Sequence, residues 1–169
     1  MTDGPALLLE NLWEPGLTMT DPEMTARLLD GVRYANKGIM LDTGHLMHTQ
    51  PALQNQRQAL SYIHTVLDRH GALCKAIRGV HLQQSITGRY MRRIAKNPPE
   101  LAADYSGRSY QLFEYVFRVD QHKPFTCAGV PELIARIAPE YLTFEFISND
   151  LPQLKRMLHR QQNVFQKKI

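Results

Sequence analysis

The chain has little cysteine and no long apolar run, and each shortage excludes a class of protein. Its two cysteines, Cys74 and Cys127, are too few for a disulfide framework and do not have the spacing of a zinc pair. No run of eighteen apolar residues is present, so we expect no membrane-spanning helix. The first residues also lack the basic segment and the apolar core of a signal peptide. We therefore expect a cytoplasmic protein with free thiols.

What the chain does have is the composition of a globular protein. Of its 169 residues, 43% are hydrophobic and 21% are charged, which suits one domain spanning residues 1–169. The formal net charge is +4, and much of the excess lies in residues 89–96 and 155–168. Such runs are compatible with a phosphorylated or nucleic-acid ligand, but a solvated helix face is the commoner explanation and the one we favour.

Short apolar runs alternate along the chain with segments of helical periodicity. The apolar runs predict strands at residues 6–10, 38–42, 77–82 and 141–147. The periodic segments predict helices over about 20–32, 51–70, 130–137 and 149–165, the first capped by Thr20 and the last by Ser148 or Asn149. This alternation is typical of parallel strands with helices packed outside them, so we predict an α/β protein.

Residues 85–119 interrupt the alternation. The segment is too long for a simple connection between a strand and a helix. Pro98 and Pro99 break it near its middle, and residues 110–116 have a helical pattern. We interpret it as an insertion above the carboxyl ends of the strands that covers a substrate.

Each predicted strand ends at or near a side chain that can bind a metal ion. These side chains are Glu10, Asp42, His81 and Glu145. The carboxyl ends of parallel strands meet at one edge of such a fold, where ligands bind. A carboxylate buried there alone is costly, and a shared cation removes the cost for several carboxylates at once. Three carboxylates and an imidazole suit Mn²⁺, Co²⁺, Mg²⁺ or Zn²⁺ without choosing among them.

Taken singly, three of the four residues have ordinary explanations. Glu10 could begin a loop, Asp42 could form an Asx turn, and an isolated histidine such as His81 is more often hydrogen-bonded in the core than bound to a metal. Glu145 is different, because it lies between two phenylalanines, where an unpaired carboxylate is unfavourable. The recurrence at four strand ends is what carries the prediction.

Three further residues form a second group of candidate metal or substrate ligands. His45 follows the second strand closely, and Asp120 and His122 are two residues apart, so both face one side of an extended chain. A solvated loop explains the Asp120–His122 pair equally well. No spacing connects His48 to a partner, and the remaining histidines are predicted to be surface residues: His64, His70 and His159.

These segments, in this order, resemble one known superfamily. They are Leu7–Leu12, Gly38–His45, Gly79–Leu82, Asp120–His122 and Leu142–Glu145. Together they look like the xylose-isomerase-like superfamily, which contains sugar phosphate isomerases and epimerases and the AP (apurinic-site) endonucleases of family 2. The resemblance extends from about Leu7 to Leu158.

The resemblance implies the C-terminal half of a TIM barrel. In the superfamily these segments lie on strands five to eight of a (β/α)8 barrel, which implies about four parallel strands with outer helices and an inserted segment at about 85–119. The first half of the barrel would be missing. Four strands leave open edges, so either the chain is a fragment or a partner supplies the rest. That partner would be an N-terminal half-barrel or another copy of the chain.

The isomerases and epimerases of the superfamily imply one function. They are similar in holding one divalent metal ion with a Glu, Asp, His, Glu set, here Glu10, Asp42, His81 and Glu145. The resemblance makes Glu10 and Glu145 the acid and base on the two faces of a sugar or sugar phosphate, with proton transfer through a metal-bound enediolate. It also makes His45 and Arg89 candidates for binding substrate oxygens.

Two alternatives stay open. The ligand types of the AP endonucleases all occur in order between Glu10 and Glu145, with His45, Asp120 and His122 added, which would imply a metal-dependent phosphodiester hydrolase acting on DNA. Residues 125–129 lack the Gly-Glu-Gly segment usual in that branch, and the insertion also departs from it, so we favour the isomerase or epimerase. An inactive or split half-barrel that needs a partner is the third interpretation.

Overall fold

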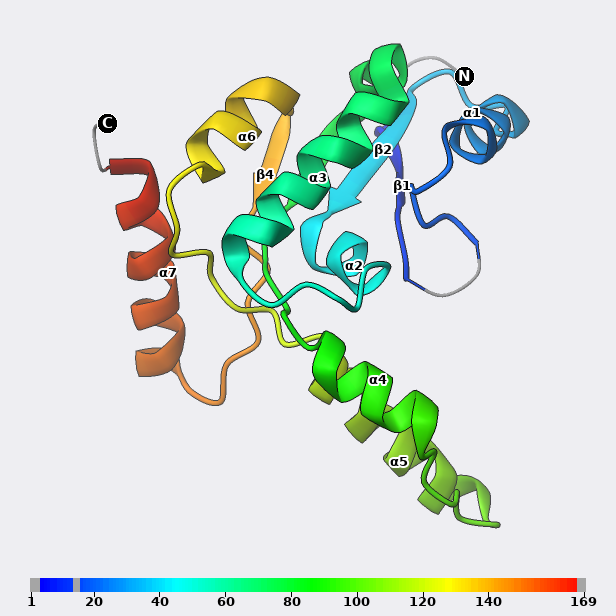
Figure 1. Cartoon of the computed structure of the whole chain (residues 1–169). Coiled ribbons are helices and arrows are strands. Elements are labelled where there is room, and N and C mark those ends of the chain that lie inside the picture. The colour runs from blue at the N-terminus through cyan, green and yellow to red at the C-terminus, as the bar shows by residue number, and fades with distance from the viewer. Residues whose placement is uncertain (1–3, 14–15, 167–169) are drawn as a thin grey trace.

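The chain folds around one parallel sheet. The computed structural model describes residues 4–13 and 16–166. Its strands lie in the order β1 (Leu7–Glu10), β2 (Lys37–Asp42), β3 (Ile77–His81) and β4 (Tyr141–Thr143), and all are parallel (Figure 1). The predicted α/β class with four parallel strands is therefore confirmed. Within the described residues, β1 and β4 each pair on one side only, so the sheet has two open edges.

Helices separate the strands along the chain. Four of them contribute to the core beside the sheet: α1 (Pro22–Gly31), α3 (Gln56–His70), α6 (Val130–Ile137) and α7 (Leu151–Gln166). A short helix, α2 (Thr43–His48), begins directly after β2, and a 3-10 helix, η1 (Gly71–Ala76), leads into β3. None of the helices in the described part of the chain combines the length and the apolarity that crossing a membrane requires.

The helices share a hydrophobic core with one face of the sheet. Ile39, Leu41 and Val80 lie on this face and are at most 1% exposed. They belong to one apolar cluster with side chains from these four helices: Leu29 of α1, Ile63 and Leu67 of α3, Leu133 of α6 and Val164 of α7. This burial places the helices outside the sheet, as the alternating pattern predicts.

The opposite face of the sheet carries the candidate ligands and is less covered. Met40 is aligned with Glu10 of β1 and with Gly79 of β3. A Cβ atom on Gly79 would lie 2.6 Å from the Met40 side chain, so these residues share a face. Side chains alternate between faces along a strand, which places Glu10, Asp42 and His81 there too. Met40 is only half-buried, and β4 is exposed along its length.

Two helix starts differ from the predicted ones because a nearby polar side chain caps the helix better. Asp21, not Thr20, caps α1, and its carboxylate accepts hydrogen bonds from two backbone amides of the first turn. The helix predicted over 51–70 begins only at Gln56. Asn55 caps it by accepting a hydrogen bond from the Gln58 amide at 3.0 Å.

The C-terminal elements are also displaced from their predicted ends. β4 stops at Thr143 instead of residue 147, and the Thr143 carbonyl accepts a hydrogen bond from the Leu82 amide at 2.8 Å. Before α7, Asp150 provides the capping carboxylate, which accepts from the Gln153 amide at 2.6 Å. The predicted caps, Ser148 and Asn149, lie too early for this role. The helix predicted over 130–137 is confirmed.

Residues 85–119 form a helical arm. Helices α4 (Gly88–Lys96) and α5 (Tyr105–Val119) pack against each other and project away from the sheet on the side where the strands end (Figure 1). The Thr87 hydroxyl donates to the Val119 carbonyl at 2.7 Å and closes the base of the arm. The predicted helix over 110–116 is thus part of the longer α5. That the segment covers a substrate stays a prediction.

Truncation of Ile63 tests the core that positions the strands. Ile63 is 0% exposed, so Ile63→Ala is expected to lower the free energy of unfolding by about 2–5 kcal/mol, through lost burial and the cavity left behind. Ser61→Ala, an exposed position two residues earlier in α3, is the control and should change it by less than about 0.5 kcal/mol. Urea unfolding followed by circular dichroism measures both, and equal effects would contradict the described packing.

Candidate metal centre

The four side chains predicted at the strand ends lie together in the structure. Glu10, Asp42 and His81 are the last residues of β1, β2 and β3, and Glu145 follows the end of β4 by two residues. Each offers one ligand atom, and these four atoms all lie within 4.8 Å of one another. We call these four residues the strand-end group. They converge because parallel strands in register bring their carboxyl ends to one edge.

The imidazole of His81 lies among the three carboxylates. Its Nδ1 is 3.1 Å from Glu10 Oε1, 3.1 Å from Glu145 Oε2 and 3.9 Å from Asp42 Oδ2. The hydrogen bond that Nδ1 donates to Glu10 raises the pKa of His81 and lowers the pKa of Glu10. A single imidazole thus faces three acids.

Asp42 is the most buried member of the strand-end group. Its side chain is fully buried, and its Oδ1 accepts hydrogen bonds from the His45 backbone amide at 2.7 Å and from Gln83 Nε2 at 3.1 Å. Burial raises the pKa of Asp42 to about 7. Its other oxygen, Oδ2, is buried without a hydrogen-bond partner, as is Oε2 of Glu145. Buried carboxylate oxygens in this state are unfavourable unless a cation or a proton joins them.

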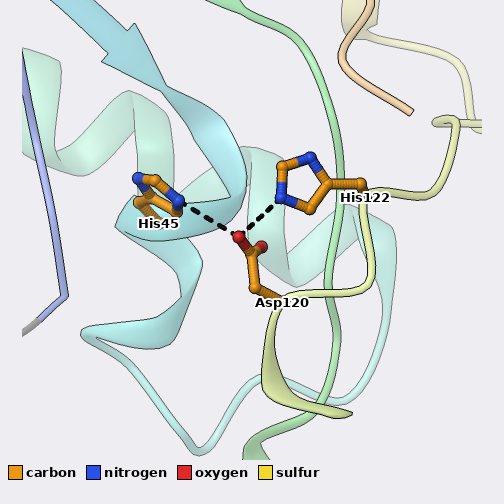
Figure 2. A group of neighbouring side chains, drawn as sticks. All are labelled: His45, Asp120 and His122. Atoms are coloured by element: carbon orange, nitrogen blue, oxygen red, sulfur yellow. Dashed lines mark hydrogen bonds and ion pairs between the residues drawn. The ribbon is translucent and has the colours of Figure 1, made fainter. Parts of the chain in front are cut away.

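A second group centres on Asp120, directly after α5. Figure 2 shows His45 and His122 directed at the same carboxylate oxygen, with Oδ2 of Asp120 2.6 Å from His122 Nε2 and 3.1 Å from His45 Nε2. The other oxygen, Oδ1, is bonded to three buried side chains, which are His48 at 3.3 Å, Gln83 at 3.0 Å and Ser85 at 3.3 Å. Both oxygens of Asp120 are therefore satisfied by the protein itself. We call Asp120, His45 and His122 the Asp120 group.

Opposite charges stabilise each other within the Asp120 group. Burial raises the pKa of Asp120, but hydrogen bonds from His122, His45 and His48 outweigh it and hold that pKa well below its usual range. Burial lowers the pKa of His45, but the hydrogen bond to Asp120 and the charge of Asp42 raise it to about 9. Because Nδ1 of His45 also lies 2.8 Å from the Asn11 carbonyl, both of its ring nitrogens donate, and His45 is a cation at neutral pH.

Gln83 connects the two groups. Its Nε2 donates to Oδ1 of Asp42 and to Oδ1 of Asp120, and its Oε1 accepts from the Ser85 hydroxyl at 3.0 Å. A Cβ atom at residue 44 would overlap the Gln83 amide, so Gly44 leaves the space that this side chain fills. The groups also approach directly, since His45 Nδ1 is 3.6 Å from Glu10 Oε1.

Several residues of the site carry no clear signal in the sequence. His48 has no companion by spacing, yet its ring bonds Asp120 across 72 residues of chain. The Trp13 ring lies 4.8 Å from the His45 ring and 5.1 Å from the His48 ring, and its indole nitrogen is buried without a hydrogen-bond partner. Gln83 and Ser85 could have been found, because polar residues directly after a strand reach the same edge of the sheet.

Other predicted residues lie elsewhere. Arg89, a candidate for substrate binding, is exposed on α4, outside the two groups of side chains. His70, predicted at the surface, is 4% exposed. Its Nδ1 faces the Val66 carbonyl at 2.9 Å and its Nε2 faces the Thr25 hydroxyl at 3.1 Å, so hydrogen bonds allow its burial.

Comparison of the chain with models of protein families, with curated proteins and with solved structures finds no match. The resemblance to the xylose-isomerase-like superfamily therefore stays a prediction. It rests on the ordered segments of the sequence.

The pH dependence of stability tests the Asp120 group. In the metal-free protein, Asp120→Asn is expected to lower the free energy of unfolding by about 3 kcal/mol, because the buried histidines lose their counter-charge. The lowered pKa of Asp120 means that its contribution is complete above its ordinary value of 3.8 and is lost as the pH falls below it. The raised pKa of His45 means that its contribution is complete below 6.5 and is lost as the pH rises through about 9.

The difference between the two proteins should therefore be largest between pH 3.8 and 6.5 and should shrink above about 9. Urea unfolding at a series of pH values measures it. Asp30→Asn, at an exposed position of α1, is the control and should show no such profile. A difference that does not vary with pH would contradict the charged pairing.

Proposed function

We propose that the strand-end group holds one divalent metal ion. The observation that carries this proposal is the pair of buried carboxylate oxygens without hydrogen-bond partners, Asp42 Oδ2 and Glu145 Oε2. They lie 3.9 Å and 3.1 Å from the same nitrogen of His81. A cation among them would neutralise acids that the fold otherwise keeps close together at a cost.

The donor set fits such an ion. Carboxylate oxygens and an imidazole nitrogen are ligands for Mn²⁺, Co²⁺, Mg²⁺ and Zn²⁺. Two donors on one ion stand at most about 4.2 Å apart, twice a metal–ligand distance of about 2.1 Å. The ligand atoms here lie within 4.8 Å of one another, so small side-chain rotations bring them to that separation.

The contrast with the Asp120 group supports one ion instead of several. Asp120 already accepts hydrogen bonds at both oxygens, and three histidines provide the compensating donors. The strand-end group instead leaves two buried oxygens without a hydrogen-bond partner. A cation would therefore stabilise the strand-end group more than the Asp120 group. The hydrogen bonds of Asp120 hold His45 and His122 in place beside the strand ends.

We infer an isomerase or epimerase that acts on a sugar or sugar phosphate. Within the strand-end group, the side chains of Glu10 and Glu145 are 35% and 38% exposed, whereas that of Asp42 is fully buried. The two glutamates are thus the acids that a substrate can reach. A bound divalent ion would polarise a carbonyl and its neighbouring hydroxyl. One glutamate would then take the proton from the carbon beside the carbonyl, and the other would return a proton.

We also propose that the sheet is the C-terminal half of a TIM barrel. Parallel sheets are normally covered on both faces, and here the face that carries the ligands is the less covered one. The edges at β1 and β4 are open within the described residues. An N-terminal half-barrel or another copy of the chain would cover that face and pair with those edges.

A metal-dependent phosphodiester hydrolase acting on DNA is the second candidate function. The convergence of the Asp120 group favours it, because one ligand atom from each of its three residues also lies within 4.8 Å of the others. In that case His45, Asp120 and His122 would hold further ions beside the first. The number of ions bound per chain separates the two functions.

Metal titration of the full chain tests the site. After chelation, the protein is expected to bind about one Mn²⁺ or Co²⁺ per chain, measured by calorimetry and by elemental analysis. Asp42→Asn should weaken binding by at least tenfold (on the order of the effect of losing a single ligand-shell contact). It should also stabilise the metal-free fold at neutral pH, because it removes a carboxylate whose charged form is disfavoured by burial, as its raised pKa of about 7 shows.

The control is Asp120→Asn, which should still bind about one ion. Two or three Zn²⁺ per chain, lost on Asp120→Asn, would favour the hydrolase. A chain that binds no divalent ion would overturn both enzymatic functions.

Exchange of hydrogen with deuterated solvent tests the reaction. Aldoses, ketoses and their phosphates are incubated with the metal-loaded protein, and incorporation of deuterium beside the carbonyl is followed by nuclear magnetic resonance. Glu145→Gln is expected to slow incorporation by about 100-fold or more, since a general acid or base contributes about that factor. His159→Gln, at an exposed position of α7, should leave the rate unchanged. No incorporation into any sugar by the wild-type protein would overturn the isomerase.

A further inference from the structure

Helix α5 of the arm exposes apolar side chains that a helix normally buries. The exposed residues are Tyr105 (79%), Tyr110 (70%), Leu112 (48%), Phe113 (65%), Val116 (39%) and Phe117 (57%). Successive residues of a helix are about 100° apart, so these six occupy one continuous arc of about 160°. Only two serines, Ser106 and Ser109, lie within the same arc. We call this surface the α5 stripe.

The other helix of the arm does not cover the α5 stripe. α5 meets α4 through its opposite side, where the Tyr115 ring lies 6.1 Å from the Tyr90 ring of α4. The side chain of Gln111, on the same side, accepts a hydrogen bond from the Ala102 amide at 2.7 Å. An apolar stripe wider than about 100° normally faces a core, whereas this one faces outward on a projecting arm (Figure 1).

The area of the α5 stripe is large for the surface of a monomer. An aromatic side chain has a surface of about 150–250 Å². With the exposed fractions above, the four aromatic residues alone expose about 500 Å² to solvent. Leu112 and Val116 bring the stripe to about 600 Å², the upper end of the range for the largest apolar patch on a monomer. Two such stripes packed together would bury at most about 1,200 Å², which reaches the lower end of the range for a stable protein–protein interface.

The charges of α5 favour another α5 stripe as the occupant. Its charged side chains, Arg108, Glu114 and Arg118, all lie outside the arc, and two of them already form an ion pair with each other. Two stripes can therefore meet without placing like charges opposite each other. The basic residues of the neighbouring helix α4 are Arg89, Arg92, Arg93 and Lys96. None of them belongs to the α5 stripe, so the stripe itself does not offer the cations that a nucleic acid or an anionic membrane would need.

We propose that the arm is a dimerisation element, in which the α5 stripe packs against the same stripe of a second copy of this chain. A twofold interface needs only one self-complementary surface, and the stripe is one. The two helices run antiparallel, which places the two sheets at opposite ends of the helix pair and opposes their helix dipoles favourably. In this arrangement, the loop at the tip of one arm, residues 97–104, lies near the C-terminal end of α5 of the other copy, which Asp120 follows.

The molar mass of the full chain in solution tests the interface. Light scattering after size exclusion should give twice the chain mass of 19.4 kDa for the wild type. Phe113→Glu combined with Phe117→Glu should give a single chain mass, because four carboxylates would face one apolar surface. Both positions are exposed, so circular dichroism should remain unchanged. This measurement needs neither metal nor substrate, so it succeeds or fails apart from the proposed function.

A matched control has the same spacing on another helix. Met24 and Leu28 of α1 are also four residues apart and exposed, at 55% and 41%, and Met24→Glu combined with Leu28→Glu should leave the dimer intact. A wild-type chain that is monomeric at every concentration would overturn the proposal. So would a dimer that survives the change at Phe113 and Phe117 or is lost in the α1 control, since either result would place the interface elsewhere.

Cysteine cross-linking tests the antiparallel direction. Leu112 lies near the middle of α5, so Leu112→Cys is expected to form a disulfide between two copies under mild oxidation. Tyr105 lies at the start of the helix, about 20 Å from its end, so Tyr105→Cys should not cross-link with itself. The wild-type chain, with Cys74 and Cys127, is the control. Self-linking at Tyr105 would show parallel helices and overturn the antiparallel arrangement.

Discussion

Asp42 connects the end of the sheet to both ligand groups, through its backbone and through its buried carboxylate. The side-chain amide of Asn11 forms two hydrogen bonds with the backbone of Asp42. It accepts from the Asp42 amide at 2.7 Å and donates to the Asp42 carbonyl at 3.0 Å, and these bonds hold the end of β1 against the end of β2. The Asp42 side chain caps α2 through the His45 amide and thereby directs the His45 ring toward Asp120. Oδ1 of Asp42 makes these structural hydrogen bonds, whereas Oδ2 faces the strand-end group without a hydrogen-bond partner.

The two ligand groups balance their charge in different ways. Asp120 is satisfied by donors from three histidines, Gln83 and Ser85, and its charge is compensated within the protein. The strand-end group instead collects three acids around one histidine. Gln83 touches both, so the satisfied group supports the unsatisfied one. Rigid neighbours of this kind hold ligands in place when no cation compensates them.

Much of the fold follows from local pattern, and its errors have local causes. The second and third apolar runs are strands that bury side chains against helices, and the helix over 130–137 has the predicted ends. The predicted start of α3 at residue 51 is wrong, because the helix begins only after Asn55, whose side chain caps it. Glu145 lies just beyond β4 and not within a strand as predicted, since β4 ends at Thr143. The outward-facing aromatic residues of α5 have the same periodicity as a core helix, so pattern alone does not show that they are exposed.

The sequence by itself determined that there are four strands and that they run parallel, because hydrophobic periodicity and the βα order are local properties of the chain. It also sufficed to choose Glu10, Asp42, His81 and Glu145 as one set. Only the tertiary structure decided which of their oxygens lack partners and which residues surround Asp120, since His48 and Gln83 reach it from segments 72 and 37 residues away. Such contacts depend on the packing of distant segments, and burial, which sets the cost of an unpaired charge, exists only after that packing.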